Sequence, residues 1–302
     1  MTVSRRTFLT ASSATLAWTA LRPSFGLAQE FETSFVDLRG GVGIFNGRGG
    51  TIGWYVAPEA VVVVDSQFPD SAKVCLSGLE SRTSRKIDLL VNSHHHGDHT
   101  AGNVVFRPAV QKILAHARAV ELHRQTAEKA NTVGAQAFAD TTFTDVWEQP
   151  VGKERLRLRY YGPAHTGGDA VITFLEANVV HMGDLVFNRR HPFIDRPGGA
   201  SIAGWITLLE RTADDHPTDT RYIFGHGSPN AGVTGGRADV LKQRDYLTAL
   251  LDFARKQMAA GKTRDDLGAF DVLPGFEDYQ GSGANLQLGR CLQTAYDELS
   301  AG

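Results

Sequence analysis

The sequence predicts an α/β fold, built as a four-layer αβ/βα sandwich with helices outside two facing sheets. Short runs of β-branched and aromatic residues, typical of strands, are interspersed with stretches of helical spacing. Both kinds occur in two comparable parts of the chain, and no linker or low-complexity segment separates them. The 302 residues are 42% hydrophobic, which suffices for a core that needs no disulfide bonds. A single domain over residues 29–302 is therefore predicted.

Residues 1–28 are predicted to be a twin-arginine export signal rather than part of this domain. Arg5 and Arg6 precede a moderately apolar run at 8–21, and Gly26-Leu27-Ala28 supplies the small residues of a cleavage site. An ordinary secretory signal or an amphipathic anchor is the alternative. The twin-arginine export machinery would then be a partner, and the mature protein is expected in the periplasm or outside the cell.

The mature chain is expected to be soluble and mildly acidic. Cleavage after Ala28 leaves 28 basic residues against 33 acidic ones, a net charge of −5. A protein with this charge lacks the basic surface that nucleic-acid binding requires. No apolar stretch after residue 28 is long enough to span a membrane. An oxidising compartment would let Cys75 and Cys291 pair, but folding before export favours two buried free thiols.

The first part of the mature chain is expected to open with strands and then to alternate helices with strands. Strands are predicted at 34–38, 42–45, 51–56, 60–64 and 87–91, with another ending at 114–115. A glycine-rich hairpin at 46–50 joins two of them. Helices are predicted at 70–82 and 117–129, and 130–140 is predicted to be a loop or partial helix.

Directly after the buried strand at 87–91 comes Asn-Ser-His-His-His-Gly-Asp-His-Thr, residues 92–100. Residues two apart in an extended chain point the same way, so His94 and His96 can converge on one metal ion. Asp98 and His99 are expected at the turn into a helix begun near residue 100, with Gly97 allowing a tight turn between the two pairs. Imidazole and carboxylate groups suit zinc.

The second part of the chain shows the same mixture of elements. Strands are predicted at 155–161, 170–175 and 179–181, and helices at 201–214, 235–260 and 287–299. Three stretches place His or Asp beside glycine just after a strand, where the backbone can approach a site closely. They contain His165 with Asp169, then Asp184, then His226.

In this order of motifs, from Asp65 through the cluster at 94–99 to His226, the chain resembles a metallo-β-lactamase-fold hydrolase. That superfamily also holds glyoxalase II and quorum-signal lactonases. The resemblance implies a first zinc ion held by His94, His96 and His165. It implies a second held by Asp98, His99 and His226. Asp184 would bridge the two ions, Asp65 would orient ligands without binding metal, and Asp169 is a further residue of that supporting kind.

Two neighbouring zinc ions can share a hydroxide, because its parent water loses a proton near neutral pH. The hydroxide would attack a carbonyl carbon, and Asp98 is the predicted catalytic residue that steers a proton toward the leaving group. The best-known true β-lactamases of the fold carry Cys or Ser where this chain has Asp184. An Asp at this position resembles glyoxalase II, lactonases and nucleases. The predicted export disfavours glyoxalase II, which acts inside cells, and the acidic net charge disfavours a nuclease.

The predicted function is thus an exported dizinc hydrolase that cleaves an ester, lactone or amide-type bond, β-lactams included, of a small molecule. The alternative is an oxidoreductase similar to persulfide dioxygenases, with one Fe²⁺. A non-catalytic metal-binding protein is disfavoured because degenerate members of the fold tend to lose metal ligands, and this chain keeps all of them. Arg189, Arg190 and His191 could bind an anionic substrate group, although a solvated charge run would explain them too. Four further histidines are predicted to be structural, namely His116, His123, His181 and His216.

Overall fold

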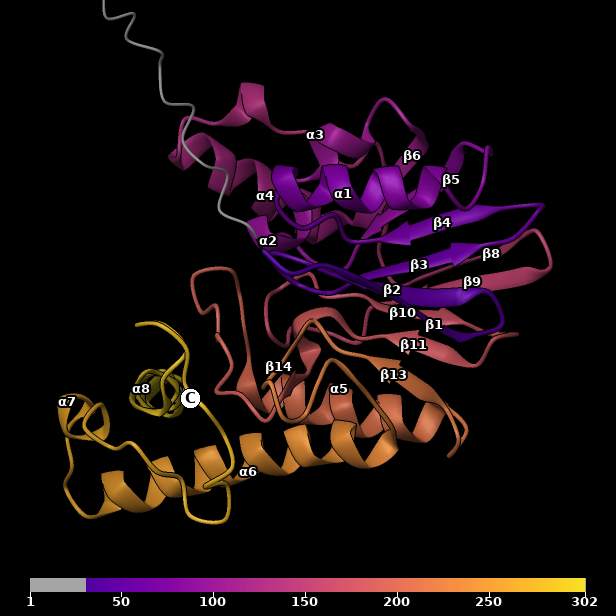
Figure 1. Cartoon of the computed structure of the whole chain (residues 1–302). Helices are drawn as coiled ribbons and strands as arrows, with labels where there is room; N and C mark the ends of the chain where they lie inside the picture. Colours follow the sequence, from indigo (N-terminus) through magenta and orange to yellow (C-terminus); the bar gives the residue numbers. More distant parts are fainter. Residues whose placement is uncertain (1–30, 302) are drawn as a thin grey trace, which may run out of the picture. The chain divides into compact units, whose positions relative to one another are not determined.

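Two β-sheets face each other and carry helices on their outer sides in the computed structural model, which describes residues 31–301 (Figure 1). The predicted four-layer sandwich is confirmed. The export signal predicted at residues 1–28 lies outside the described residues.

The first sheet has seven strands that follow one another in sequence order, antiparallel from β1 to β4 and parallel from β4 to β7. These strands are β1 (Ser34–Arg39), β2 (Val42–Asn46), β3 (Ile52–Val56), β4 (Val61–Val64), β5 (Ile87–Asn92), β6 (Val110–His116) and β7 (Thr141–Phe143).

The second sheet has six strands in the order β15-β13-β11-β10-β9-β8, and within it only the β11–β13 pair is parallel. A two-stranded parallel pair, β12 with β14, lies beside it. These strands are β8 (Val146–Val151), β9 (Glu154–Arg159), β10 (Val171–Phe174), β11 (Val179–His181), β12 (Phe187–Asn188), β13 (Arg221–Ile223), β14 (His226–Gly227) and β15 (Thr234–Gly235).

The layers follow from the alternation of side chains along buried strands such as β4. Val61 and Val63 belong to the core between the first sheet and helices α1 (Pro69–Glu80) and α4 (Ala117–Lys129). Val62 and Val64 belong to the core between the two sheets. All four are fully buried, and each contributes about 1.5–3 kcal/mol to folding.

Helices α5 (Ile202–Asp215) and α6 (Arg237–Ala259) pack on the outer face of the second sheet. Trp205 of α5 is fully buried in this third core. Gly261, at φ 78°, follows the end of α6 and allows the chain to leave the helix there. The short α7 (Arg264–Leu267) and then α8 (Leu288–Ala301) follow, and α8 packs against α6.

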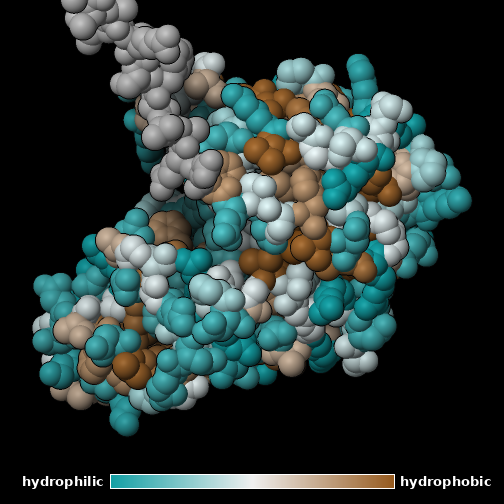
Figure 2. Space-filling model, in the orientation of Figure 1, coloured by the Kyte–Doolittle hydropathy of each residue, from teal (hydrophilic) through white to brown (hydrophobic). Residues whose placement is uncertain are grey.

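Cys75 on α1 and Cys291 on α8 are both buried and unpaired, in agreement with the preferred prediction. Among the described residues, no helix combines the length and apolar character that crossing a membrane requires. On the face shown in Figure 2, hydrophobic side chains form patches set among hydrophilic ones.

Several strands were not predicted, namely β7, β8 and the two-residue strands β12, β14 and β15. In β8 most side chains are exposed, so the burial pattern that reveals a strand is missing. The helix of the histidine motif also begins earlier than predicted: α2 spans Gly97–Thr100, and α3 (Asn103–Phe106) follows separately.

Candidate metal centre

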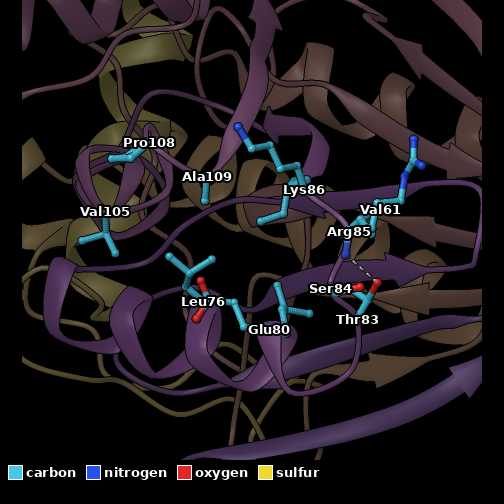
Figure 3. A pocket seen from close by; sticks show the side chains of 12 residues that line it. Val61, Leu76, Glu80, Thr83, Ser84, Arg85, Lys86, Val105, Pro108 and Ala109 are labelled. Atoms are coloured by element: carbon cyan, nitrogen blue, oxygen red, sulfur yellow. Dashed lines mark hydrogen bonds between the residues drawn. The ribbon is translucent and has the colours of Figure 1, made fainter.

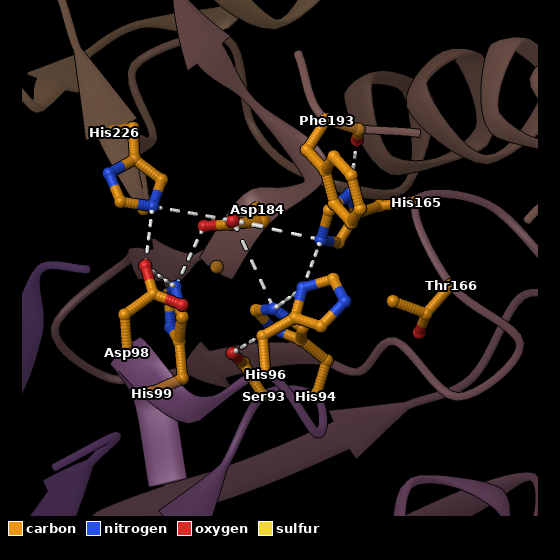
Figure 4. A network of polar contacts seen from close by, with 12 residues as sticks. Ser93, His94, His96, Asp98, His99, His165, Thr166, Asp184, Phe193 and His226 are labelled. Atoms are coloured by element: carbon orange, nitrogen blue, oxygen red, sulfur yellow. Dashed lines mark hydrogen bonds and ion pairs between the residues drawn. The ribbon is translucent and has the colours of Figure 1, made fainter. Parts of the chain in front are cut away.

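Seven ligand-type side chains converge where strands of both sheets end (Figure 4). Strand β5 ends at Asn92, and the chain then carries His94, His96, Asp98 and His99 through a short extended stretch into α2. The second half of the chain supplies the remaining three from separate positions. His165 lies between β9 and β10, Asp184 in the 3₁₀ turn after β11 (Gly183–Leu185), and His226 at the start of β14.

The first ligand group consists of His94, His96, His165 and Asp184. The Nδ1 atom of His96 lies 3.1 Å from His94 Nε2 and 3.0 Å from His165 Nε2. Asp184 Oδ2 lies 3.9 Å from His94 Nε2 and 3.6 Å from His165 Nε2. These four atoms come from three separate segments and face one point.

The second group consists of Asp98, His99, His226 and the same Asp184. Asp98 Oδ2 lies 3.1 Å from His226 Nε2 and 3.6 Å from His99 Nε2. Asp184 Oδ1 lies 2.9 Å from His99 Nε2, and its Oδ2 lies 3.4 Å from His226 Nε2. Asp184 therefore offers an oxygen to each group, which is the position expected of a bridging ligand.

The donor atoms fit metal ions. Ligands about 2.0–2.1 Å from a tetrahedral zinc ion lie about 3.3 Å from one another, and the distances in both groups fall around that value. His99 Nε2 and Asp184 Oδ1 are buried and lie 2.9 Å from each other. Apart from this mutual contact, neither atom has a hydrogen-bond partner among the described residues. A cation bound between them would satisfy both atoms.

The charges of the two groups differ. Burial lowers the pKa of His94 well below its usual value and that of His165 to about 3, so both imidazoles are neutral and free to bind metal. In the second group burial also acts to lower the pKa of His226, but the carboxylates of Asp184 and Asp98 raise it to about 9. The second group thus attracts positive charge strongly.

Two glycines allow this close packing. A Cβ atom on Gly225 would lie 2.0 Å from Asp184 Oδ1, and one on Gly50 would lie 2.1 Å from the His99 ring. Any larger residue at either position would displace a ligand.

Asp65, at the end of β4, orients ligands of both groups. Its Oδ2 lies 2.7 Å from His99 Nδ1, which leaves His99 Nε2 directed at the second group. The same carboxylate accepts hydrogen bonds from the backbone N–H and the hydroxyl of Ser93, whose Oγ lies 3.0 Å from His94 Nδ1. Asp65 adopts the left-handed region at φ 65°, which is uncommon for residues with a side chain, although aspartate adopts it more readily than most.

Asp169 supports the site less directly. It accepts hydrogen bonds from the backbone N–H and the hydroxyl of Thr166, next to His165. Burial raises its pKa to about 7, against the lowering effect of these bonds. The ring of His165 is itself held by the carbonyl oxygen of Phe193, 2.8 Å from Nδ1. Phe193 and Asp195, which contacts His96, are site residues that the sequence reasoning missed.

The three residues predicted to contact substrate lie in different surroundings. Arg189 is paired with Asp239 and Asp278. His191 is buried, and its Nδ1 lies 2.8 Å from the Tyr246 hydroxyl. Arg190 is half-buried and lines a cavity of about 340 Å³ together with His226, Gln67 and the 46–50 hairpin. Of the three, Arg190 is the one that faces the metal centre.

The other histidines predicted to be structural are hydrogen-bonded away from both groups. His116 contacts Thr144 O, His123 contacts Gln136, His181 contacts Thr51 O and His216 contacts Thr212 O and Thr173.

A separate cavity of about 460 Å³ lies beneath α1 (Figure 3). It includes Val61 and Ile87, the first residues of β4 and β5, whereas the ligands follow the opposite, carboxyl ends of strands. Its walls are mainly aliphatic, and none of the seven ligand residues lines it. This cavity plays no part in the metal centre.

The αββα sandwich and the two adjoining ligand groups define a class of protein with a candidate site for metal ions. Over residues 46–241 the sequence matches the metallo-beta-lactamase superfamily, and the chain belongs to that superfamily. A curated relative is the 2,4-dinitroanisole O-demethylase subunit alpha of Nocardioides sp. (strain JS1661). It is 29% identical over 129 residues, which are 42% of this chain and 38% of that protein. The chain thus matches well under half the length of this relative.

Solved structures show the same fold. The stereoselective inverting sec-alkylsulfatase Pisa1 from Pseudomonas sp. superposes with a TM-score of 0.70 and 16% identity, over 88% of this chain and 50% of that chain. A metallo-beta-lactamase from Pontibacter korlensis superposes with a TM-score of 0.60 and 16% identity, over 72% of this chain and 99% of that chain.

Proposed function

We propose that the protein is an exported hydrolase that holds two zinc ions and cleaves an ester, lactone or amide-type bond of a small substrate. The observation that carries this proposal is the pair of four-atom ligand groups that share Asp184. When bound, two zinc ions would supply Lewis acidity and lower the pKa of a water molecule to near neutrality. Export is supported by the Arg5-Arg6 pair and the Gly26-Leu27-Ala28 cleavage site.

Asp98 is suited to handle the proton because it is the more accessible of the two ligand carboxylates. Its side chain is 27% exposed, against 4% for Asp184. Burial acts to raise its pKa, but His99 and His226 lower it to about 2. An ionised Asp98 can accept a hydrogen bond from an attacking water and hold it toward the substrate. A proton taken up at Asp98 would be released again readily to a leaving group, since its pKa is low.

The surroundings of the ligands favour a small substrate with an anionic group. Arg190 lines the cavity beside His226, and none of the described carboxylates forms an ion pair with it. On the side of the first group, the Phe193 ring is 37% exposed, and its centroid lies 5.4 Å from that of His96. An anionic group could thus bind Arg190 while a compact apolar part contacts Phe193. Alkyl sulfates are further candidate substrates because a structural neighbour is an alkylsulfatase. Aryl ethers are candidates because the curated relative is a subunit of a dinitroanisole O-demethylase.

Metal analysis together with a substrate panel tests the proposal. Protein purified without chelators should contain about two zinc ions per chain, and chelation should abolish hydrolysis until zinc is restored. Anionic esters, lactones, β-lactams and alkyl sulfates should be turned over better than long-chain acyl lactones. One iron per chain with oxygen-dependent turnover of a persulfide would support the dioxygenase alternative, and protein free of metal would support neither enzyme.

The role of Arg190 can be separated from that of its neighbour. A desolvated charge-assisted hydrogen bond contributes about 1.5–3 kcal/mol, and a half-buried arginine should give the lower end of that range. Arg190→Ala should therefore raise KM for an anionic substrate about 10-fold relative to a neutral analogue. Arg189→Ala is the matched control, because Asp239 and Asp278 already neutralise that charge. Equal effects of Arg190→Ala on both compounds would refute the assignment.

A further inference from the structure

The carboxylate of Asp195 contacts the metal centre from a loop between β12 and α5. Its Oδ2 lies 3.1 Å from His96 Nε2 and 3.4 Å from His95 Nε2. The other nitrogen of the His96 ring, Nδ1, is the atom that faces His94 and His165 in the first ligand group. The His96 ring thus lies between Asp195 on one edge and the ligand group on the other.

The loop holds this carboxylate in place by several bonds. The backbone N–H of Gly198 donates to Asp195 Oδ1 at 3.0 Å. The backbone N–H of Asp195 donates to His165 O at 3.2 Å, and Asp195 O accepts from the N–H of Ala200 at 2.9 Å. A Cβ on residue 198 would lie 2.0 Å from Asp195 Oδ2, so the turn requires glycine there.

We propose that Asp195 is a positioning residue for the first metal ion. Its Oδ2 accepts a hydrogen bond from the Nε2–H of His96 and thereby fixes the tautomer in which Nδ1 carries no proton and is directed at the metal. This inference rests on the proposed metal centre. A carboxylate that accepts from a ligating histidine also raises the basicity of the ligand, and losing such a partner typically weakens metal binding about 10–100-fold.

Each half of the centre then has its own orienting carboxylate. Asp65 contacts His99 of the second group directly, and it reaches His94 only through Ser93. No described contact joins Asp65 to His96. The carboxylate that orients the His96 ring is therefore that of Asp195. His95 Nε2 also lies 3.4 Å from Asp195 Oδ2, and His95 belongs to neither ligand group.

The same three side chains, His95, His96 and Asp195, lie close enough to hold an ion of their own. A third ion there would require His96 to ligate through both ring nitrogens at once. A hydrogen bond at 3.1 Å requires only the neutral imidazole, which carries one proton. The hydrogen-bonded arrangement is therefore the one proposed.

The test measures zinc affinity and stoichiometry in Asp195→Asn and Asp195→Ala by competition with a chromophoric chelator. Only one of the two zinc sites should lose affinity. One dissociation constant should therefore rise about 10–100-fold while the other stays unchanged. Asn keeps one acceptor oxygen, for which His96 and Gly198 N compete, so the loss should be smaller for Asn than for Ala. Arg196→Ala is the matched control, because Arg196 braces the same loop through Ala200 O and Glu298 without contacting a ligand.

A second measurement does not depend on the variants. Long-range ¹H–¹⁵N NMR of the zinc-loaded wild-type protein should show His96 protonated at Nε2, with that proton in a hydrogen bond that disappears in Asp195→Ala. His96 protonated at Nδ1, three zinc ions per wild-type chain, or equal losses in Arg196→Ala and Asp195→Ala would each overturn the inference. Two zinc ions bound without hydrolysis of any substrate would refute the proposed function and leave the role of Asp195 intact.

Discussion

Removing the metal ions is expected to make the stability of the protein fall as the pH rises. Burial acts to lower the pKa of His226, but Asp184 and Asp98 raise it from 6.5 to about 9 in the metal-free protein. A group with a raised folded-state pKa stabilises the fold fully below its unfolded pKa, and the contribution is lost as pH rises through the folded pKa. The contribution of His226 should therefore be complete below pH 6.5 and gone above about pH 9.

Raising the pKa of His226 from 6.5 to about 9 corresponds to about 3 kcal/mol of stability. The side chain is 18% exposed, so solvent screens this interaction only in part. His99 acts in the same direction, because burial lowers its pKa but three carboxylates raise it well above the usual value. His165 acts oppositely: its pKa of about 3 gives stability above pH 6.5 that is lost as the pH falls. The metal-free protein should be most stable near pH 6.5.

Zinc should reverse this dependence on the alkaline side, because a metal ion binds the neutral imidazole and binding therefore tightens as protons leave. The assay is urea unfolding of chelated and zinc-loaded protein between about pH 6 and 9.5, compared by the free energy of unfolding. His226→Gln is the control and should flatten the slope of the chelated protein. A chelated protein whose stability stays constant or rises from pH 6.5 to 9, or a slope unchanged in His226→Gln, would refute the reasoning.

Three further predictions concern the ligands and the export signal. Asp184→Ala removes the oxygen donors shared by both groups, so bound metal and hydrolysis should fall together; full occupancy by two metal ions would contradict the bridging assignment. Asp65→Ala should weaken zinc binding about 10–100-fold, as read by chelator competition, and unchanged affinity would exclude an orienting role. Replacing Arg5 and Arg6 together by Lys should leave the protein in the cytoplasm with residues 1–28 attached, whereas normal processing would show that another export route is used.

The sequence allowed us to predict the strands and helices whose side chains follow a regular pattern of burial. Elements without such a pattern were not predicted. Strands such as β4 and β5 are buried along their length, so their apolar runs were recognisable. Strand β8 contains Glu148 and Pro150 and is mostly exposed, and pairing with β9 rather than its own pattern makes it a strand. The helix α4 was predicted at its observed bounds because its amphipathic period is uninterrupted.

The site shows the same division between local and tertiary information. His94, His96, Asp98 and His99 could be grouped from spacing alone. His165, Asp184 and His226 were singled out as isolated candidates beside glycine, and only the resemblance joined them to that group. Backbone hydrogen bonds from Met182 to Ile223 and from Gly225 to Gly183 bring the last two segments together, and no local pattern encodes such contacts.

Two details could not have been read from the chain. Asp195 precedes an Arg-Pro-Gly-Gly turn, which by itself indicates only a loop. Its contact with His96 arises because that loop folds back onto the His165 segment. Gly97 was expected to be needed for a tight turn, but its φ is not positive and an added Cβ would meet no atom within 4 Å. Alanine should therefore fit at that position.

The fold itself orients the side chains of the proposed metal centre, and this affects how metal binding would be coupled to folding. Four of the five histidine ligands have their second ring nitrogen against a protein group: Ser93 for His94, Asp195 for His96, Asp65 for His99 and Phe193 O for His165. The fifth, His226, stacks on Phe187 at a centroid distance of 5.3 Å. Because these contacts depend on the packed sheets, the entropy of ordering the ligands is lost during folding rather than during metal binding. Small zinc domains that are unfolded without metal lack such supports. In this protein, chelation should therefore remove metal ions from a chain that stays folded, which is the condition under which the pH dependence of His226 can be measured.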